Sequence, residues 1–335
     1  EESLEKNNQQ LAFEPIDFGY LKNSKSNKGT AAGQLSCNFS GSRRFKVGSL
    51  RDHILGFRGV NGKGDIIKSG GTVVKNVTGY DLSKLVTGSF GTLTALTEIT
   101  FKVLPKKDSI STLVIYLEDN KIISDLFDQL LSSSNEISGA VYIPVEPNNK
   151  NYTKNIEKIF KFNNLKSEEP FVAVRIEGSK KSIDERIQDI SQELQTNKMK
   201  TSILDFYQSK LFWEKINNLE LFSGTKNNLL RAVIPTATSL DLMKYLKNNF
   251  KYYIDWCGSL FWIEVLEEEN IQIKEMKETI INLGGYLTIV KKSESLSSDI
   301  DLFTINDTRL LLSQKIKESF DPKKLLNPGK MYRGL

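Results

Sequence analysis

The residues best suited to contact a ligand gather between positions 70 and 101. Residues 70–85 read Gly-Gly-Thr-Val-Val-Lys-Asn-Val-Thr-Gly-Tyr-Asp-Leu-Ser-Lys-Leu, and two more glycines follow within residues 88–93. Glycine lets a backbone come close to a bound molecule, and the N–H groups of such loops can surround a phosphate or another polar group. We therefore interpret this stretch as one wall of a ligand site.

Four different functional groups lie close together in that stretch: the ammonium of Lys75, the amide of Asn76, the phenol of Tyr80 and the carboxylate of Asp81. Such groups can bond to the carbonyls or phosphates of a ligand, and Gly79 would leave room for a planar ring. The alternative is a structural turn in which Asp81 caps the following helix and Tyr80 packs into the core. The spacing alone does not separate these two interpretations.

Two loops of small residues precede this stretch. Residues 29–38 read Gly-Thr-Ala-Ala-Gly-Gln-Leu-Ser-Cys-Asn, and residues 41–49 carry glycines near both ends. The small side chains of the first loop leave the backbone as the contact surface, and we expect a loop followed by a short helix there.

Three arginines, Arg43, Arg44 and Arg51, lie in or just after the second loop. A guanidinium group can neutralise a phosphate through two parallel hydrogen bonds. Surface salt bridges explain the same arginines, and an ion pair between Arg51 and Asp52 is an equally good interpretation.

The chain offers few groups for metal or nucleophilic catalysis. His53 is the only histidine, and Cys37 and Cys257 are the only cysteines. A metal site built on several histidines is excluded, and two cysteines are too few for a disulfide scaffold or an iron–sulfur cluster within this chain. Because His53 opens a predicted strand, a structural role is favoured over that of a catalytic base.

A second group of candidates lies farther along the chain. Residues 255–258, Asp-Trp-Cys-Gly, form a compact turn that could face a ligand or a partner, although a tryptophan at a strand end more often belongs to the core. Arg175, Glu177 and Arg231 alternate with apolar residues on predicted strands. They could line a substrate pocket, and solvated strand faces explain them equally well.

The elements around the opening stretch are readable from turn residues and alternation. Residues 57–60 and 65–68 flank Asn-Gly-Lys-Gly, which predicts a β-hairpin. A helix over 81–86 and a strand over 94–104, ended by Pro105, complete the region.

Beyond residue 106 glycine becomes rarer and strands alternate with amphipathic helices, which predicts a second α+β lobe with an antiparallel sheet. The last segment, with Pro322 and Pro328, is predicted to be a rigid tail that returns to the first lobe. The predicted strands are 111–117, 139–145, 171–177, 228–234, 252–255, 259–264 and 287–290, the predicted helices are 121–132, 181–196, 206–217, 240–249, 271–283 and 308–319, and 148–154 is predicted to be a polar loop.

Composition narrows the class of protein. The chain has 335 residues, of which 39% are hydrophobic and 26% charged, enough for a core shared between two lobes. The net charge of +5 is spread over many lysines without one basic block, which disfavours a nucleic-acid-binding protein. No apolar run reaches the ~20 residues that a membrane-spanning helix needs, and the polar N-terminus is unlike a secretory signal.

These residues resemble a known family. Residues 48–56, 70–101 and 320–332 together are similar to flavoproteins of the vanillyl-alcohol-oxidase (VAO) type, also called the PCMH type. Residues 75–82 and 254–258 resemble the FAD-binding E subunits of glycolate oxidase, or glycolate dehydrogenase. The resemblance covers essentially the whole chain and is strongest in 29–105 and 320–335.

The resemblance implies an α+β protein with a PCMH-type FAD-binding domain, an α+β cap domain and a C-terminal segment that returns to the FAD-binding domain. We place the FAD-binding domain at 1–105, the cap or substrate domain at 106–305 and the return at 306–335. Because the chain begins without Met and the glycine-rich pyrophosphate loop of the family is not found, the N-terminal half of the FAD-binding domain is expected to be missing, leaving the second half.

The same resemblance implies which residues face FAD, whereas no catalytic residue and no metal ligand is assigned. The expected FAD-binding residues are Thr30, Ala32, Gly33, Asn38, Gly41, Gly48, Ser49, Asp52, Leu55, Lys75, Asn76, Gly79, Tyr80, Asp81, Gly91, Leu96, Thr97 and Asn327.

The implied function is that of the FAD-binding subunit of a complex that oxidises glycolate to glyoxylate and passes electrons through flavin to an iron–sulfur subunit. Since His53 is a poor candidate for the base, a related flavin subunit is expected to carry the turnover. The implied location is cytoplasmic, at the inner face of the membrane where partner subunits hold the chain there. The alternatives are a stand-alone FAD oxidoreductase for another 2-hydroxy acid such as lactate, and a non-catalytic scaffold subunit.

Overall fold

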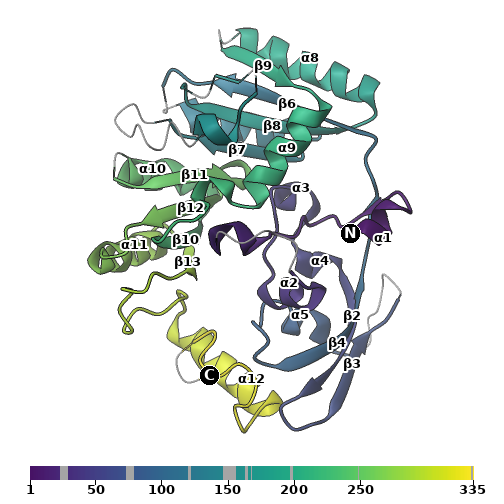
Figure 1. The fold of residues 1–335 in the computed structure, drawn as a ribbon, viewed down its shortest axis with the longest axis vertical. Coiled ribbons are helices and arrows are strands. Elements are labelled where there is room, and N and C mark those ends of the chain that lie inside the picture. The colour runs from purple at the N-terminus through teal and green to yellow at the C-terminus, as the bar shows by residue number, and fades with distance from the viewer. Residues whose placement is uncertain are drawn as a thin grey trace. The chain divides into compact units, whose positions relative to one another are not determined.

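A computed structural model describes residues 1–22, 29–72, 79–119, 122–145, 156–162, 165–166, 168–196, 199–247, 249–332 and 335. The chain divides into two compact units. The first unit comprises Glu1–Asp17, Ser26–Lys106 and Asp301–Leu335, and the second comprises Phe18–Lys25 and Lys107–Ile300. Figure 1 labels their helices and strands.

The first unit is built on a three-stranded antiparallel sheet in the order β3-β2-β4. Strands β2 (Ile54–Asn61) and β3 (Ile66–Gly70) form the predicted hairpin, and β4 (Thr94–Phe101) pairs with the other edge of β2. The Asn61 side chain closes the hairpin turn, because its Oδ1 accepts the N–H groups of Lys63 and Asp65 at 3.0 and 2.9 Å.

Short helices cover this sheet and supply its core. Their bounds are Ala31–Cys37 for α2, Arg44–Val47 for α3, Leu50–His53 for α4 and Leu82–Val86 for α5. The buried cluster consists of Phe13, Leu35, Leu50, Ile54, Phe57 and Val86. The predicted strand beyond Phe101 is wrong in detail, because β4 ends there and Leu104–Pro105 forms a separate short strand, β5, that pairs with β1 (Gln9–Gln10). A further short helix, α1, spans Glu2–Glu5.

The C-terminal segment lies in the first unit. Asn306 caps the start of helix α12 (Asp307–Phe320), where its Oδ1 accepts the Arg309 N–H at 2.9 Å. At its other end the Phe320 carbonyl accepts the N–H of Gly62 at 3.0 Å, so the helix ends against the β2–β3 turn.

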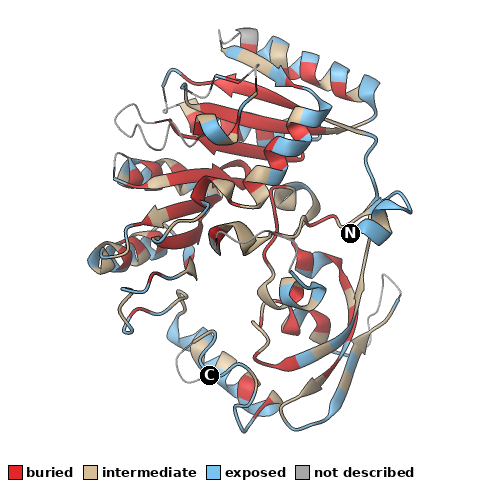
Figure 2. Cartoon of the chain, in the orientation of Figure 1, coloured by how far each residue is buried: buried red, intermediate tan, exposed pale blue. Residues whose placement is uncertain are grey.

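The second unit is built on an eight-stranded sheet in the order β13-β10-β12-β11-β7-β8-β6-β9, in which all pairs are antiparallel, as predicted. Figure 2 shows the central strands buried along almost their whole length. The strands are β6 (Ser109–Tyr116), β7 (Gly139–Ile143), β8 (Phe171–Gly178), β9 (Lys200–Leu204), β10 (Asn228–Val233), β11 (Lys251–Asp255), β12 (Leu260–Val265) and β13 (Tyr286–Lys291).

Five α-helices of this unit match predicted helices to within a few positions. They are α6 (Ile123–Ser132), α8 (Lys180–Thr196), α9 (Phe206–Asn217), α10 (Ser239–Leu246) and α11 (Asn270–Asn282). Helix α8 buries Ile183, Ile187, Ile190 and Leu194, the apolar stripe read from the sequence. Strand β9 was not predicted, and the predicted loop 148–154 lies outside the described residues.

The polar candidates of this unit are buried. Arg175 is 1% exposed, donates from Nη2 to the Ser138 carbonyl at 2.8 Å and stacks on the Trp213 ring at 4.5 Å. Arg231 is 4% exposed and lies 4.9 Å from the centre of the Trp256 ring. The interpretation of these arginines as solvated strand faces is therefore wrong.

The turn at 255–258 also belongs to the core. Trp256 and Cys257 are buried, as the core interpretation of this turn requires. Burial raises the pKa of the Cys257 thiol, and the nearby carboxylates of Asp255 and Asp128 raise it further. This thiol is therefore protonated and unreactive at neutral pH.

Candidate functional site

The first predicted loop forms the start of helix α2. Thr30 is its N-cap, and its Oγ1 accepts the Gly33 N–H at 3.0 Å. Gly33 is exposed, and Ala32 is half-buried. A Cβ on Gly33 would lie 3.1 Å from Thr30 Oγ1, so the glycine keeps this cap compact. The predicted loop and short helix are confirmed.

The other end of α2 is linked to the loop that carries Gly91. Asn38 ends the helix in a left-handed conformation (φ 52°), and its Oδ1 accepts the Arg51 N–H at 3.2 Å. The N–H of Phe90 donates to the Ser36 carbonyl at 2.8 Å. Helix α2, the start of α4 and the Gly91 loop are thus held together by hydrogen bonds.

The second loop leads into helix α4 through a capping arrangement. The Asp52 Oδ2 accepts both the Ser49 N–H at 2.8 Å and the Ser49 hydroxyl at 2.9 Å. Burial raises the pKa of this carboxyl, but the two Ser49 hydrogen bonds, with His53 and Arg44 nearby, outweigh it and hold the pKa below its ordinary value. A Cβ on Gly48 would lie 2.8 Å from Asp52 Oδ2, so these residues support one another.

Other predicted residues of this region also have structural partners. The N–H of Gly41 donates to the carbonyls of Phe13 and Glu14 at 3.2 and 3.0 Å. Arg43 pairs with Glu14, with Nη1 and Oε1 3.6 Å apart, and Arg51 Nε donates to the Lys84 carbonyl at 3.1 Å. These arginines therefore brace the loop.

The stretch from Gly70 to Asp81 is described only at its ends, because Lys75 and Asn76 lie outside the described residues. Gly79 has φ +76°, and a Cβ placed on it would meet no atom within 4 Å. Tyr80 is 94% exposed, so the alternative interpretation in which its ring packs into the core is wrong. Asp81 is the N-cap of α5 and accepts the Lys84 N–H at 3.1 Å, as the structural interpretation of this turn predicts.

The remaining predicted residues lie along β2, β4 and the C-terminal tail. The Leu55 carbonyl accepts the Gly71 N–H at 3.2 Å, and Thr97 Oγ1 donates to the Arg58 carbonyl at 3.1 Å. Leu96 packs against the core cluster. The Asn327 Nδ2 donates to the Phe90 carbonyl at 2.8 Å and lies 2.8 Å from a Cβ placed on Gly91. The tail and the Gly91 loop are therefore in direct contact.

The single histidine has a structural position. His53 is 5% exposed, its Nε2 lies 2.9 Å from the Val47 carbonyl, and its ring packs 6.2 Å from that of Phe13. Within the described ranges no cluster of His, Cys, Asp and Glu could hold a metal ion. The first unit therefore offers backbone and hydroxyl groups, and its histidine is not placed to act as a base.

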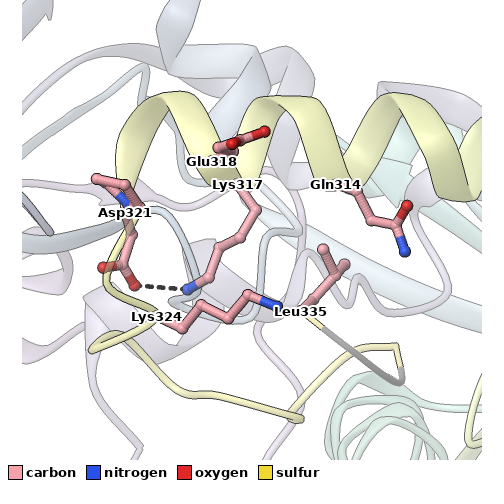
Figure 3. Close-up of a pocket in the computed structure, with 7 residues that line it drawn as sticks. Gln314, Lys317, Glu318, Asp321, Lys324 and Leu335 are labelled. Atoms are coloured by element: carbon pink, nitrogen blue, oxygen red, sulfur yellow. Dashed lines mark hydrogen bonds and ion pairs between the residues drawn. The ribbon is translucent and has the colours of Figure 1, made fainter.

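A cavity of about 280 Å³ lies at the end of α12 and is lined by none of the predicted cofactor residues (Figure 3). Two of its lining residues, Lys317 and Asp321, are almost fully buried and form an ion pair at 2.7 Å. Sequence reasoning missed both, because Lys and Asp four positions apart on a helix usually form an exposed pair. The lining residues labelled in the figure are Gln314, Lys317, Glu318, Asp321, Lys324 and Leu335.

The first unit fits a flavin where its backbone is open. Gly71 and Gly79 bracket residues 73–78, and a Cβ on either glycine would meet nothing within 4 Å. The exposed Tyr80 ring adjoins Gly79. An open backbone beside an unburied aromatic ring can accept a planar group.

Each helix within the described ranges is too short or too polar to cross a bilayer.

No family model matches the chain, but it is similar in sequence to curated proteins. It is 28% identical over 337 residues to glycolate oxidase subunit GlcE of Escherichia coli (strain K12), covering 100% of this chain and 79% of that protein. It is 25% identical over 343 residues to glycolate oxidase subunit GlcD of Bacillus subtilis (strain 168), covering 96% and 70%. A shorter match, 40% identical over 90 residues, covers 27% of this chain and 19% of a D-lactate dehydrogenase of Anaerostipes hadrus.

The fold is that of known flavoproteins. The chain superposes on alkyldihydroxyacetonephosphate synthase with a TM-score of 0.63 and 19% identity, covering 98% of this chain and 61% of that one. It superposes on a VAO-type flavoprotein from Myceliophthora thermophila C1 with a TM-score of 0.58 and 11% identity, covering 97% of this chain and 63% of that one. It also superposes on p-cresol methylhydroxylase with a TM-score of 0.63 and 14% identity, covering 98% of this chain and 72% of that one. The chain thus spans less than two thirds of the first two structures. The predicted α+β, VAO/PCMH-type fold and the resemblance to glycolate oxidase subunits are confirmed.

Proposed function

We propose that this chain is an FAD-dependent oxidoreductase subunit of a glycolate oxidase complex, which converts glycolate to glyoxylate. The observation that carries this proposal is the similarity to GlcE along the whole chain. In this proposal the first unit holds FAD and the second unit is the cap domain, with the boundaries predicted from the sequence.

FAD would be held by residues whose main chain is open to an approaching ligand. The N-terminal turn of α2 offers the main-chain N–H of Ala32, and Gly79 leaves room for a ring beside Tyr80. The loop at Gly91, fixed by Asn327, supplies a further stretch of backbone. When bound, FAD supplies a two-electron acceptor for oxidation of a hydroxy acid.

We assign this chain to cofactor binding and electron transfer rather than to abstraction of the substrate proton. A base must lie within hydrogen-bonding reach of the substrate hydroxyl. His53 is buried against the Val47 carbonyl and Phe13, so it cannot meet this requirement in the first unit. A related flavin subunit would carry the turnover, and an iron–sulfur subunit would receive the electrons. A cytoplasmic location, with membrane contact through partners, accompanies this proposal.

A second function is supported by the short match to D-lactate dehydrogenase. In that case the chain would be a stand-alone FAD oxidoreductase for D-lactate or a similar 2-hydroxy acid. It differs from the first proposal in one testable respect, since it needs no partner for turnover.

The experiment compares the full-length protein purified alone with the protein co-expressed with its candidate partner subunits. Bound FAD is measured by absorbance after denaturation, and activity by glycolate-dependent and D-lactate-dependent reduction of a dye. We expect FAD in both preparations and glycolate turnover only with partners. D-lactate turnover by the isolated chain would support the second function, and absence of FAD from both preparations would contradict both and identify a scaffold.

A further inference from the structure

The buried ammonium of Lys317 joins three segments of the first unit. Its Nζ donates to the Asp321 Oδ2 at 2.7 Å, to the Thr92 carbonyl at 2.7 Å and to the Leu326 carbonyl at 2.8 Å. An ammonium has three N–H donors, so every donor of Lys317 has an acceptor. Lys317 is 2% exposed, and Figure 3 shows its side chain directed at Asp321. One side chain thus connects α12 with Thr92 in the Gly91 loop and with the tail.

The two carbonyls that Lys317 holds adjoin two residues of the proposed FAD site. Thr92 follows Gly91, and Leu326 precedes Asn327. Asn327 in turn donates to the Phe90 carbonyl at 2.8 Å. The Gly91 loop and the tail are therefore held together twice, once by Asn327 at the proposed site and once by Lys317 behind it.

Asp321 fixes the tail from the other side of the ion pair. Its Oδ1 accepts the Leu325 N–H at 3.0 Å, and its Oδ2 accepts the Leu326 N–H at 2.7 Å. A Cβ on Gly62 would overlap Asp321 Oδ1, so the hairpin turn also packs closely on this carboxylate. Asp321 is fully buried, which makes the pair costly to break on either side.

We propose that Lys317 is a positioning residue for the flavin site, which it serves by fixing the Thr92 and Leu326 carbonyls and so the relative placement of Gly91 and Asn327. This inference rests on the proposed function, because the proposed function identifies FAD as the ligand of the site. A purely stabilising ion pair would also be buried, but it would not need to join the backbone on both sides of the site. The two roles separate when both charges are removed together.

The experiment uses the full-length protein with Lys317→Met, Asp321→Asn and the double substitution. Lys317→Met alone leaves a buried, unpaired carboxylate, so its melting temperature falls. The double variant removes that charge and recovers part of the melting temperature. The amide at position 321 can accept only one of the Leu325 and Leu326 N–H groups, so Asp321→Asn alone is the reference for the double variant. The Thr92 and Leu326 carbonyls still lack their donor, so we expect the Kd for FAD to stay raised on the order of tenfold.

Two readouts separate positioning from stability. The Kd is measured by quenching of FAD fluorescence, and hydrogen–deuterium exchange of the FAD-free protein is followed in peptides covering 88–92 and 325–330. We expect faster exchange in both peptides of the double variant than in Asp321→Asn, which keeps Lys317. The matched control is Lys215→Met with Glu220→Gln, which removes a half-buried ion pair of 3.1 Å in the second unit and should leave both readouts within twofold of wild type.

The outcomes distinguish the two levels of the proposal. A double variant that binds FAD as tightly as wild type, with unchanged exchange in both peptides, would overturn the role of Lys317 and leave the proposed function standing. A wild-type protein that binds no FAD, alone or with partners, would overturn the proposed function and with it the role of Lys317.

Discussion

Two glycines with the same backbone conformation should respond very differently to replacement by alanine. Gly70 has φ +73° and Gly79 has φ +76°, so each alanine pays about 1–2 kcal/mol for the left-handed conformation. A Cβ on Gly70 would also overlap the Leu55 carbonyl oxygen and lie 2.8 Å from the Gly56 Cα, whereas a Cβ on Gly79 would meet nothing within 4 Å. Overpacking adds about 1–3 kcal/mol or more.

The free energy of unfolding should therefore fall by about 2–5 kcal/mol in Gly70→Ala and by about 1–2 kcal/mol in Gly79→Ala. Both are measured by urea denaturation of the FAD-free protein. For Gly79→Ala we further expect the Kd for FAD to rise on the order of tenfold, because the added methyl occupies the space through which a ring would approach. Equal losses of stability would refute the packing argument, and an unchanged Kd in Gly79→Ala would remove Gly79 from the site.

Three further predictions test the roles assigned to single side chains. Tyr80→Ala should change the free energy of unfolding by less than about 0.5 kcal/mol, because the ring is 94% exposed. It should still weaken FAD binding several-fold, as measured by titration, and unchanged binding would exclude contact between Tyr80 and the flavin. His53→Gln, which can still donate to the Val47 carbonyl, should leave the kcat of the assembled complex within twofold, and a loss of more than a hundredfold would make His53 catalytic. Burial raises the pKa of Asp321, but the hydrogen bonds from Lys317 and the tail N–H groups lower it more. The ionised Asp321 therefore stabilises the fold fully above about pH 4, and this stabilisation is lost as the pH falls through the lowered pKa. The free energy of unfolding of Asp321→Asn should not show this loss when it is measured against pH.

The sequence was most informative where a local rule decides the structure. The hairpin follows from Asn-Gly-Lys-Gly between two alternating runs, and the turn is closed by the Asn61 side chain as such sequences allow. Helix α9 was predicted with its observed bounds, and the structure shows why it begins there, because the Asp205 side chain caps its first turn. Strand β9 was missed because five residues, Lys-Thr-Ser-Ile-Leu, give too short a pattern, and its pairing with β6 comes from distant sequence.

The site was less predictable, because the same side chain can serve folding or binding. Asp81 has the chemistry of a ligand contact, but its carboxylate caps α5. Tyr80 was expected to be buried if the turn were structural, yet the turn is capped and the ring is exposed. Lys317 and Asp321 carried no sequence signal, since their burial depends on the tail and the Gly91 loop meeting around them.

Glycine at positive φ separates the positions that folding explains from those it leaves unexplained. Gly70 and Gly91 would clash with the chain's own atoms if they carried a side chain, and Gly64 (φ +89°) belongs to the hairpin turn, so no ligand is needed to account for them. Gly79 and Gly329 also have positive φ, but a Cβ on either would meet only open space. A glycine in the left-handed conformation with no packed neighbour leaves space for another molecule to approach the backbone. Of these two positions Gly79 also adjoins an exposed aromatic ring, which is why we propose Gly79, rather than Gly329, as the point at which a ligand approaches the backbone.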